Sequence, residues 1–305
     1  MKSKALKHEL LLLGAVILAL GLLSFTGYFS VQRDKLIDLL FTKKPHTNQV
    51  VLLKIDEGSL QAVGQWPWPR AIFANLIQKL GDASVIGIDV NFKEPSRLGE
   101  QDDWLLEQAL KNSKVPVILT SEVASFKNFA IVYPLERFYK NVKTGFANLN
   151  VGSDGVARRF SPQCCEGTQK AFGVAMSLEA GQTFSHEDSP RIYFRGPADT
   201  MPFFSVRDIL ENKVPKEFLA GKAVIIGATA KDLQDFHSTP FGLMSGAELQ
   251  ANVLETVLGQ KFLTDLDSWW LFLIILALGA VTVAVSFKVK KLFSLIGWVA
   301  AILAF

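Results

Sequence analysis

Three side chains that could bind a ligand lie at the ends of short apolar runs: Asp56, Asp89 and Thr229. Each run is only a few residues long and is rich in aliphatic residues, which predicts a buried strand. In an open α/β sheet, ligands bind in the crevice beyond the carboxyl ends of parallel strands. We therefore expect these three side chains to meet at one edge of a parallel sheet and to line a ligand site there.

Two further acidic residues, Glu94 and Asp235, are candidates for the same site. We expect Asp56 and Asp89 to end neighbouring strands, so that the four carboxylates would form an oxygen-rich pocket of the kind that suits a divalent cation. Carboxylates at strand ends also cap helices or pair with a cation such as Arg70. A structural role, a ligand-binding role and a metal site all stay open, so we assign no metal ligand and leave the cofactor unknown.

An aromatic loop follows the first of these strands, with Trp66 and Trp68 alternating with prolines directly before Arg70. Two indole rings beside a guanidinium group could stack against a ligand ring or clamp an anion. The same residues could equally form a rigid lid packed on the edge of the sheet. We count Trp66, Trp68 and Arg70 among the candidate ligand-binding residues.

Patterns for catalysis are weak. Lys222 precedes a glycine-containing strand end, whereas a P-loop places its lysine after the glycines, which excludes nucleotide hydrolysis at this point. Asp235, His237 and Ser238 could supply a base and a nucleophile, but no serine has the flanking glycines of a nucleophile elbow. We therefore predict no catalytic residue and no enzymatic activity for this chain.

Charge and cysteine content exclude other classes. The formal net charge of +3 and the lack of a basic stripe interleaved with aromatic residues argue against a nucleic-acid partner. The only cysteines are the neighbours Cys164 and Cys165, which lack the spacing of a zinc site. They are two thiols in a surface turn, a redox-sensitive pair or a link to another subunit.

Strand and helix patterns alternate through the first half of the large central segment. Such a series, connected by right-handed crossovers, predicts an α/β domain with a mixed, largely parallel sheet. A turn signal at 153–155 predicts an antiparallel hairpin. The expected strands are 50–55, 84–90, 115–120, 130–133, 145–151, 156–161, 192–194 and 223–226, and the expected helices are 69–80, 102–111, 169–180, 206–211 and 247–258.

Hydrophobic residues, 49% of the chain, are concentrated in uncharged runs near its two ends. Each full run is long enough to cross a bilayer core as a helix. Lysines precede the first run and follow the second, so the positive-inside rule places both clusters in the cytoplasm. The predicted order is a cytoplasmic N-terminus at 1–9, a transmembrane helix at 10–32, an extracytoplasmic domain at 33–267, a transmembrane helix at 268–287, a cytoplasmic loop at 288–291 and the beginning of a further, incomplete span at 292–305.

The outer segment resembles a known family of sensory domains through many short motifs in the same order. The resemblance covers most of residues 35–262 and is to the CHASE domain of the second type, the cyclase- and histidine-kinase-associated sensory extracellular module. Gln250 stands where that family often has histidine, which argues against a metal role at this position. The motifs are Ile55-Asp56, Gly64 to Arg70, Gly87-Ile88-Asp89, Glu94-Pro95, Gly145 to Asn148, Asp154 to Arg159, Leu219 to Lys222, Ile226 to Ala230, Leu233-Gln234-Asp235, Thr239-Pro240 and Gly246 to Asn252.

The resemblance implies a bacterial receptor of the inner membrane. Its outer domain would bind an unidentified small ligand or periplasmic protein and relay the signal across the bilayer to a cyclase or kinase output, which this chain does not contain. Receptors of this kind are expected to be homodimers. Two alternatives from other classes are a metal-dependent periplasmic ectoenzyme and a structural envelope protein.

Overall fold

The chain folds into two compact units in the computed structural model. One comprises Met1–Leu40 and Thr264–Phe305, and the other Phe41–Leu263. The expected beginning of a further span at 292–305 lies outside the described residues, apart from positions 299 and 301. The structure describes residues 2–125, 130–185, 189–263, 265, 267–289, 299 and 301.

The larger unit is built on a seven-stranded sheet in the order β10-β1-β11-β2-β3-β4, with β5 also paired to β3. All the pairs are parallel except β3 with β4, which confirms the mixed, largely parallel sheet. The late strand β11 lies between β1 and β2, so the expectation that Asp56 and Asp89 end neighbouring strands is wrong. The strands of this sheet are β1 (Val50–Ile55), β2 (Val85–Asp89), β3 (Val117–Ser125), β4 (Ala130–Val132), β5 (Lys143–Phe146), β10 (Phe203–Ser205) and β11 (Ala223–Ala228).

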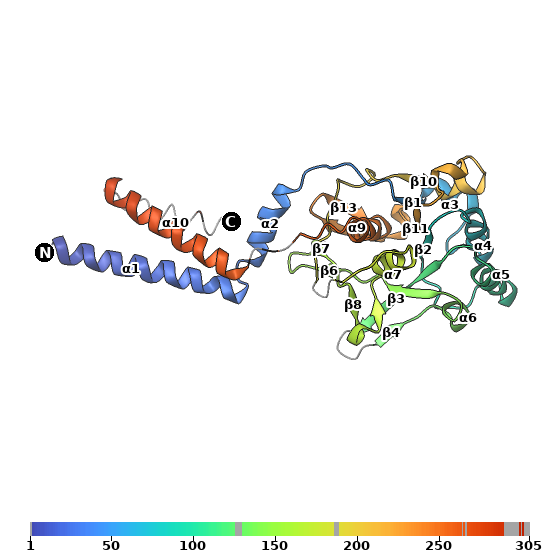
Figure 1. The fold of residues 1–305 in the computed structure, drawn as a ribbon, viewed down its shortest axis with the longest axis horizontal. Helices are drawn as coiled ribbons and strands as arrows, with labels where there is room; N and C mark the ends of the chain where they lie inside the picture. Colours follow the sequence, from blue (N-terminus) through green and yellow to red (C-terminus); the bar gives the residue numbers. More distant parts are fainter. Residues whose placement is uncertain are drawn as a thin grey trace. The chain divides into compact units, whose positions relative to one another are not determined.

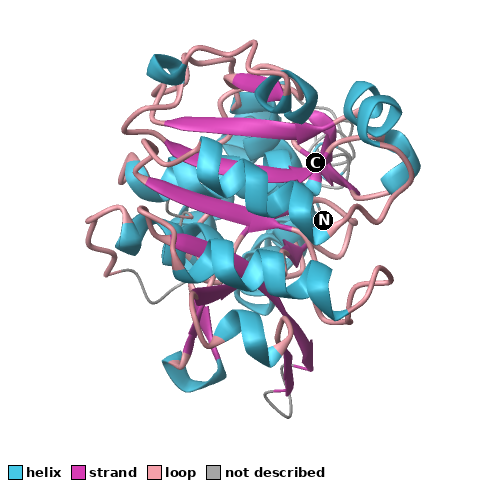
Figure 2. Ribbon diagram, turned by 90° about the vertical axis from the view of Figure 1, so that its right-hand side faces the viewer, coloured by secondary structure: helices cyan, strands magenta, loops and turns pink. Residues whose placement is uncertain are grey.

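Helices cover both faces of the sheet (Figure 1) because its central strands are apolar on both sides. In β1, Val51 and Leu53 pack with α4 and α5, whereas Val50 and Leu52 pack with α7 and α9. Figure 2 views the sheet from the side of α4 and α5. The helices of this unit are α3 (Glu57–Val63), α4 (Arg70–Lys79), α5 (Glu100–Lys111), α6 (Glu136–Tyr139), α7 (Phe172–Glu179), α8 (Val206–Leu210) and α9 (Gly246–Leu258).

Short antiparallel pairs complete the unit. The hairpin expected around 153–155 is confirmed, because β6 pairs with β7 across that turn. The strand expected at 145–151 is split, since its first residues join the main sheet as β5 and its last form β6. The segment expected as a strand at 192–194 is not one. The short strands are β6 (Asn150–Val151), β7 (Ala157–Arg159), β8 (Gln163–Cys164), β9 (Gln169–Lys170), β12 (Phe236–Thr239) and β13 (Gly242–Ser245).

The smaller unit contains α1 (Lys2–Leu23), α2 (Ser30–Leu40) and α10 (Ser268–Val289). The single helix expected over 10–32 is interrupted, because a short 3-10 turn and Gly27, at φ 73°, separate α1 from α2. Among the described residues, α10 alone is long and apolar enough to cross a membrane as one straight helix. The stretches 10–26 and 30–40 meet the length and hydropathy requirement for a membrane span only when they are taken together. The axes of these two stretches differ in direction by 79°.

Helices α1 and α10 contact each other within this unit. Gly21 lies against the ring of Phe272, and Gly279 lies against Ile17. Small residues let two helices approach closely, which is typical of helix pairs in lipid. The Phe25 and Trp269 rings meet edge to face at 5.0 Å near the end of the pair.

The contact between β5 and α7 requires a glycine at position 145. A Cβ at Gly145 would lie 2.6 Å from Cα of Phe172, which is backbone and cannot turn aside. We expect Gly145→Ala to lower the free energy of unfolding by about 1–3 kcal/mol, because α7 would have to shift away from the sheet. Gly81→Ala is the matched control, since its nearest contact would be an ordinary 3.5 Å. Denaturation of the full chain in detergent checks both, and equal stabilities would contradict the expected clash.

Candidate functional site

Two cavities adjoin at the carboxyl ends of β11, β2 and β3, and we call them together the crevice. Their volumes are about 300 and 320 Å³, and they share Asp89, Asn91 and Asp235 in their walls. The first is otherwise lined by Trp66, Pro67, Trp68, Arg70, Phe73, Val90, Ala228 and Leu233. The second is otherwise lined by Thr120, Ser121, Glu122, Val132, Ala147 and Asn148.

A larger cavity of about 480 Å³ lies between α4 and α5, and Gly81, Asp82 and Lys114 place it at the amino ends of the strands. Ligands of open α/β sheets bind at the other edge, beyond the carboxyl ends. The crevice is also where the candidate residues from the sequence gather. For both reasons we take the crevice as the candidate site.

The first turn of α9 lies against Asp235, a residue of the crevice wall, and against the end of β11. Asp89 pairs with Gly227 across β2 and β11, and a Cβ on Gly227 would overlap the side chain of Ala247. Gly246, the first residue of α9, lies directly against the Asp235 carboxylate and also donates its backbone N–H to the Asp235 carbonyl at 2.9 Å. The two glycines therefore let α9 approach the strand end closely enough to bring Asp235 to Asp89.

Asp89 is the chemically distinctive residue of the crevice. Among the described residues no group donates a hydrogen bond to its carboxylate, although it is only partly exposed. Burial, and to a smaller extent the nearby Asp235 carboxylate, raise the pKa of Asp89 to about 7, although His237 acts in the opposite sense. Nε2 of His237 lies 3.2 Å from Oδ1 of Asp235, and this hydrogen bond raises the pKa of His237.

Aromatic rings form another part of the wall. The Trp66 and Trp68 rings meet edge to face at 5.5 Å, and Trp66 also meets the Phe73 ring at 6.4 Å. The indole of Trp68 is fixed by a hydrogen bond from Nε1 to the Gly64 carbonyl at 3.0 Å, and its side chain is almost fully buried. The loop is therefore a packed lid whose rings still border the crevice.

Arg70 borders the crevice, and two of the five N–H groups of its guanidinium have partners within the protein. Nε faces Asp103 at 3.4 Å, Nη2 donates to the Glu94 carbonyl at 2.9 Å, and the guanidinium lies 4.7 Å from the centre of the Phe92 ring. The Arg70 backbone N–H donates to Asp102 at the start of α5. Glu94 itself lines a third cavity of about 320 Å³, which shares Pro67, Trp68, Arg70 and Asn91 with the first but is not lined by Asp89 or Asp235.

Asp56 and Thr229 do not line the crevice. Asp56 caps α3, because its carboxylate accepts hydrogen bonds from Ser59 N at 2.7 Å and Ser205 Oγ at 3.0 Å. The segment directly after Asp56 is therefore a short helix and not a loop. The sequence pattern that could have predicted this helix is Asp56, a residue type that favours the N-cap position. Thr229 lies beside β1, where its backbone N–H donates to the Ile55 carbonyl, and its buried hydroxyl has no hydrogen-bond partner among the described residues.

The structure adds Asn91 and His237 to the candidate residues. Asn91 follows Asp89 by two positions, so the rule that placed Asp89 at a strand end could have found it. His237 reaches the site only because β12 pairs with β13 and returns the chain to α9, which no local pattern shows. Gln250, buried on α9, donates to the Ala147 carbonyl at 2.7 Å. No group of three or more His, Cys, Asp or Glu side chains that could hold a metal ion occurs in the part of the chain that the structure describes.

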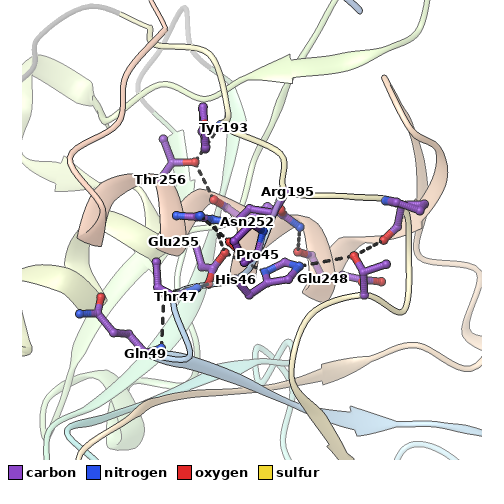
Figure 3. Close-up of polar contacts among 12 residues, drawn as sticks. Pro45, His46, Thr47, Gln49, Tyr193, Arg195, Glu248, Asn252, Glu255 and Thr256 are labelled. Atoms are coloured by element: carbon purple, nitrogen blue, oxygen red, sulfur yellow. Dashed lines mark hydrogen bonds and ion pairs between the residues drawn. The ribbon is translucent and has the colours of Figure 1, made fainter. Parts of the chain in front are cut away.

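A second buried cluster lies on α9, away from the crevice, and we call it the latch (Figure 3). Its centre is Glu255, whose side chain is fully buried. One carboxylate oxygen lies 2.9 Å from His46 Nδ1 and 3.0 Å from Arg195 Nε, and the other accepts hydrogen bonds from the backbone and hydroxyl of Thr47. Arg195 in turn donates to the Pro45 carbonyl at 2.7 Å.

The latch fastens the segment that follows α2 in the chain. Burial alone would raise the pKa of Glu255, but the hydrogen bonds from His46 and Thr47 outweigh it and hold the pKa below its usual range. The ionised carboxylate is therefore the stable form, and it stabilises the folded state at pH values above about 4.5. Lys44 adds a hydrogen bond from Nζ to the Tyr193 hydroxyl at 2.6 Å.

The pKa of Asp89 predicts a dependence of stability on pH. An acid whose pKa is raised by folding stabilises the protein when protonated, and this contribution is lost as the pH rises through about 7. We expect the unfolding free energy of the wild type to fall by up to about 1.4 kcal/mol per pH unit between about pH 4 and 7, relative to Asp89→Asn. Parallel pH profiles of thermal unfolding for the two proteins would contradict this assignment.

Comparison with known proteins gives one match. No curated protein and no solved structure shows significant similarity to the chain. A family model of the CHASE2 domain matches residues 13–284, which include the whole of the larger unit and part of the smaller one. This agrees with the motifs found in the sequence, several of which the structure places in the sheet, the lid and α9. Because the match spans most of the chain, the protein belongs to the CHASE2 family of extracellular sensory domains.

Proposed function

We propose that this chain is the sensory part of a bacterial receptor of the inner membrane. Its outer domain binds a ligand in the crevice and passes the signal through its membrane helices to a cyclase or kinase output. The observation that carries the proposal is Asp89, which lines two adjoining cavities in a sensory domain and is part-buried, with no hydrogen-bond donor to its carboxylate in the described part of the chain. A part-buried carboxylate that lacks a hydrogen-bond donor destabilises the folded state, and such groups are concentrated at functional sites.

The proposed membrane helices are α10 and the apolar part of α1. The stretch 268–285 of α10 is long and apolar enough to cross the bilayer, and α1 packs against α10 through Gly21 and Gly279. In the sequence, lysines precede the apolar part of α1, at positions 2, 4 and 7, and follow the apolar part of α10, at positions 288, 290 and 291. Their positive charge favours the cytoplasm, which places the sheet domain on the outer side.

Helix α9 is suited to connect the crevice with the membrane helices. At its first turn, Gly246 contacts Asp235 of the crevice wall, and Glu255 near its other end holds the latch. The thirteen residues of α9 form one rigid rod of roughly 20 Å. A ligand that favours one position of the first turn would therefore move Glu255, and with it the segment at 44–47 that leads back to α2.

The receptor is further proposed to act as a homodimer, because cyclase and kinase outputs of such receptors work in pairs. In that arrangement a movement of α9 in each copy would change how the membrane helices of the pair meet. The partner on the outer side would be a small ligand or a periplasmic protein.

Labelling of single cysteines tests the proposed topology. Asn48→Cys lies on an exposed position of the sheet domain, and Lys4→Cys lies in the first lysine cluster. We expect a membrane-impermeant maleimide to label Asn48→Cys in intact spheroplasts and Lys4→Cys only after lysis. The wild type measures the background from the buried Cys164 and Cys165. Labelling of Lys4→Cys in intact spheroplasts would overturn the proposed orientation.

Hydrogen exchange tests the latch. Glu255→Gln removes the charge that holds His46 and Arg195, and removing one partner of a buried ion pair costs about 3 kcal/mol. We expect faster amide exchange at 44–49 and a lower unfolding temperature in the full chain. Asp232→Asn, at an exposed carboxylate, is the matched control and should leave both unchanged. Unchanged exchange in Glu255→Gln would show that the latch does not hold this segment.

A further inference from the structure

We propose that the crevice takes a cationic ligand, an ammonium group attached to a small apolar body. This inference rests on the proposed function and deepens it by naming the chemical class of the ligand. The combination that carries it is a cavity bordered by two facing carboxylates and by aromatic rings, in which one carboxylate has no hydrogen-bond donor among the described residues.

The charges around the crevice favour a cation. Asp89 and Asp235 both line it, and Asp235 also forms a hydrogen bond with His237. Arg70 is the cationic side chain in the wall of the first cavity, but its charge is paired with the Asp103 carboxylate 3.4 Å from Nε, and Nη2 donates to the Glu94 carbonyl. A cationic group would supply the donor that Asp89 lacks and would relieve its repulsion with Asp235. An anionic ligand would meet these two carboxylates directly.

The aromatic wall favours the same class. Trp66, Trp68 and Phe73 border the cavity together with apolar Val90 and Leu233. Indole faces attract ammonium groups, and the rings and aliphatic side chains would cover an apolar body. The cavity of about 300 Å³ is at the small end of the range for ligand sites, so the body would be no larger than one ring or a short chain.

Binding of a cation should depend on pH. Asp89 and Asp235 face each other, His237 is hydrogen-bonded to Asp235, Glu122 lines the second cavity and Arg70 borders the first. Because burial and Asp235 raise the pKa of Asp89 to about 7, a cation must displace a proton from Asp89 at lower pH. We expect affinity to rise with pH up to about 8 and then to level off.

Matched probes test the inference on the full chain in nanodiscs of zwitterionic lipid. Benzylammonium and tetramethylammonium are the cations, and benzyl alcohol and benzoate are the neutral and anionic analogues of the first. We expect millimolar benzylammonium to raise the unfolding temperature, and the two analogues to have no effect. Asp89→Asn and Asp235→Asn should each weaken benzylammonium binding at least tenfold, whereas Asp232→Asn should bind as the wild type does.

Several results would overturn the inference. These are a lack of stabilisation by both cations, equal stabilisation of wild type and Asp89→Asn, or stronger stabilisation by benzoate. If benzoate or benzyl alcohol binds and Trp66→Ala abolishes the effect, the crevice remains a ligand site and the proposed function stands without the cationic class. Labelling and hydrogen exchange test the topology and the latch separately, so failure of the proposed function is distinguished from failure of this inference.

Discussion

The close contact between the first turn of α9 and the end of β11 is the constraint on which the rest of the structure depends. It requires glycine at 227 and at 246, because a Cβ at either position would overlap Ala247 or Asp235. With these glycines present, α9 packs against Asp235 and holds it in the crevice wall beside Asp89. The same docking buries the length of α9, including Glu255. Both the candidate site and the latch therefore follow from one helix–strand contact.

The two clusters on α9 have opposite electrostatic character. At the latch, one carboxylate is surrounded by His46, Arg195 and the donors of Thr47, and its pKa is lowered. In the crevice, Asp89 lies near the Asp235 carboxylate and has no hydrogen-bond donor among the residues that the structure describes, and its pKa is raised. The first arrangement is satisfied within the folded chain and suits a permanent fastening. In the second, no hydrogen-bond donor to Asp89 occurs among the described residues, which is why we propose it as the ligand site.

The sequence predicted most elements and a substantial part of the candidate site. Strand β1 and helix α9 were predicted closely, since apolar runs of strand length and a strong helical period depend on local sequence alone. Trp66, Trp68, Arg70, Asp89 and Asp235 do line the crevice. Asp56 was placed there wrongly, because a carboxylate at a strand end can cap the next helix as readily as it can bind a ligand. The interruption of the first apolar helix was missed, since hydropathy measures apolar character and not continuity.

By itself, the sequence determined the apolar ends with their lysine clusters, the largely parallel sheet and the family, because each of these is encoded in local composition, period or motif order. Only the tertiary structure decided that β11 inserts between β1 and β2, which separates Asp56 from Asp89. It also decided that His237 joins Asp235 and that His46 joins Glu255, 209 residues away in the chain. Strand order and long-range ion pairs arise from packing the whole chain at once, and no local pattern carries them.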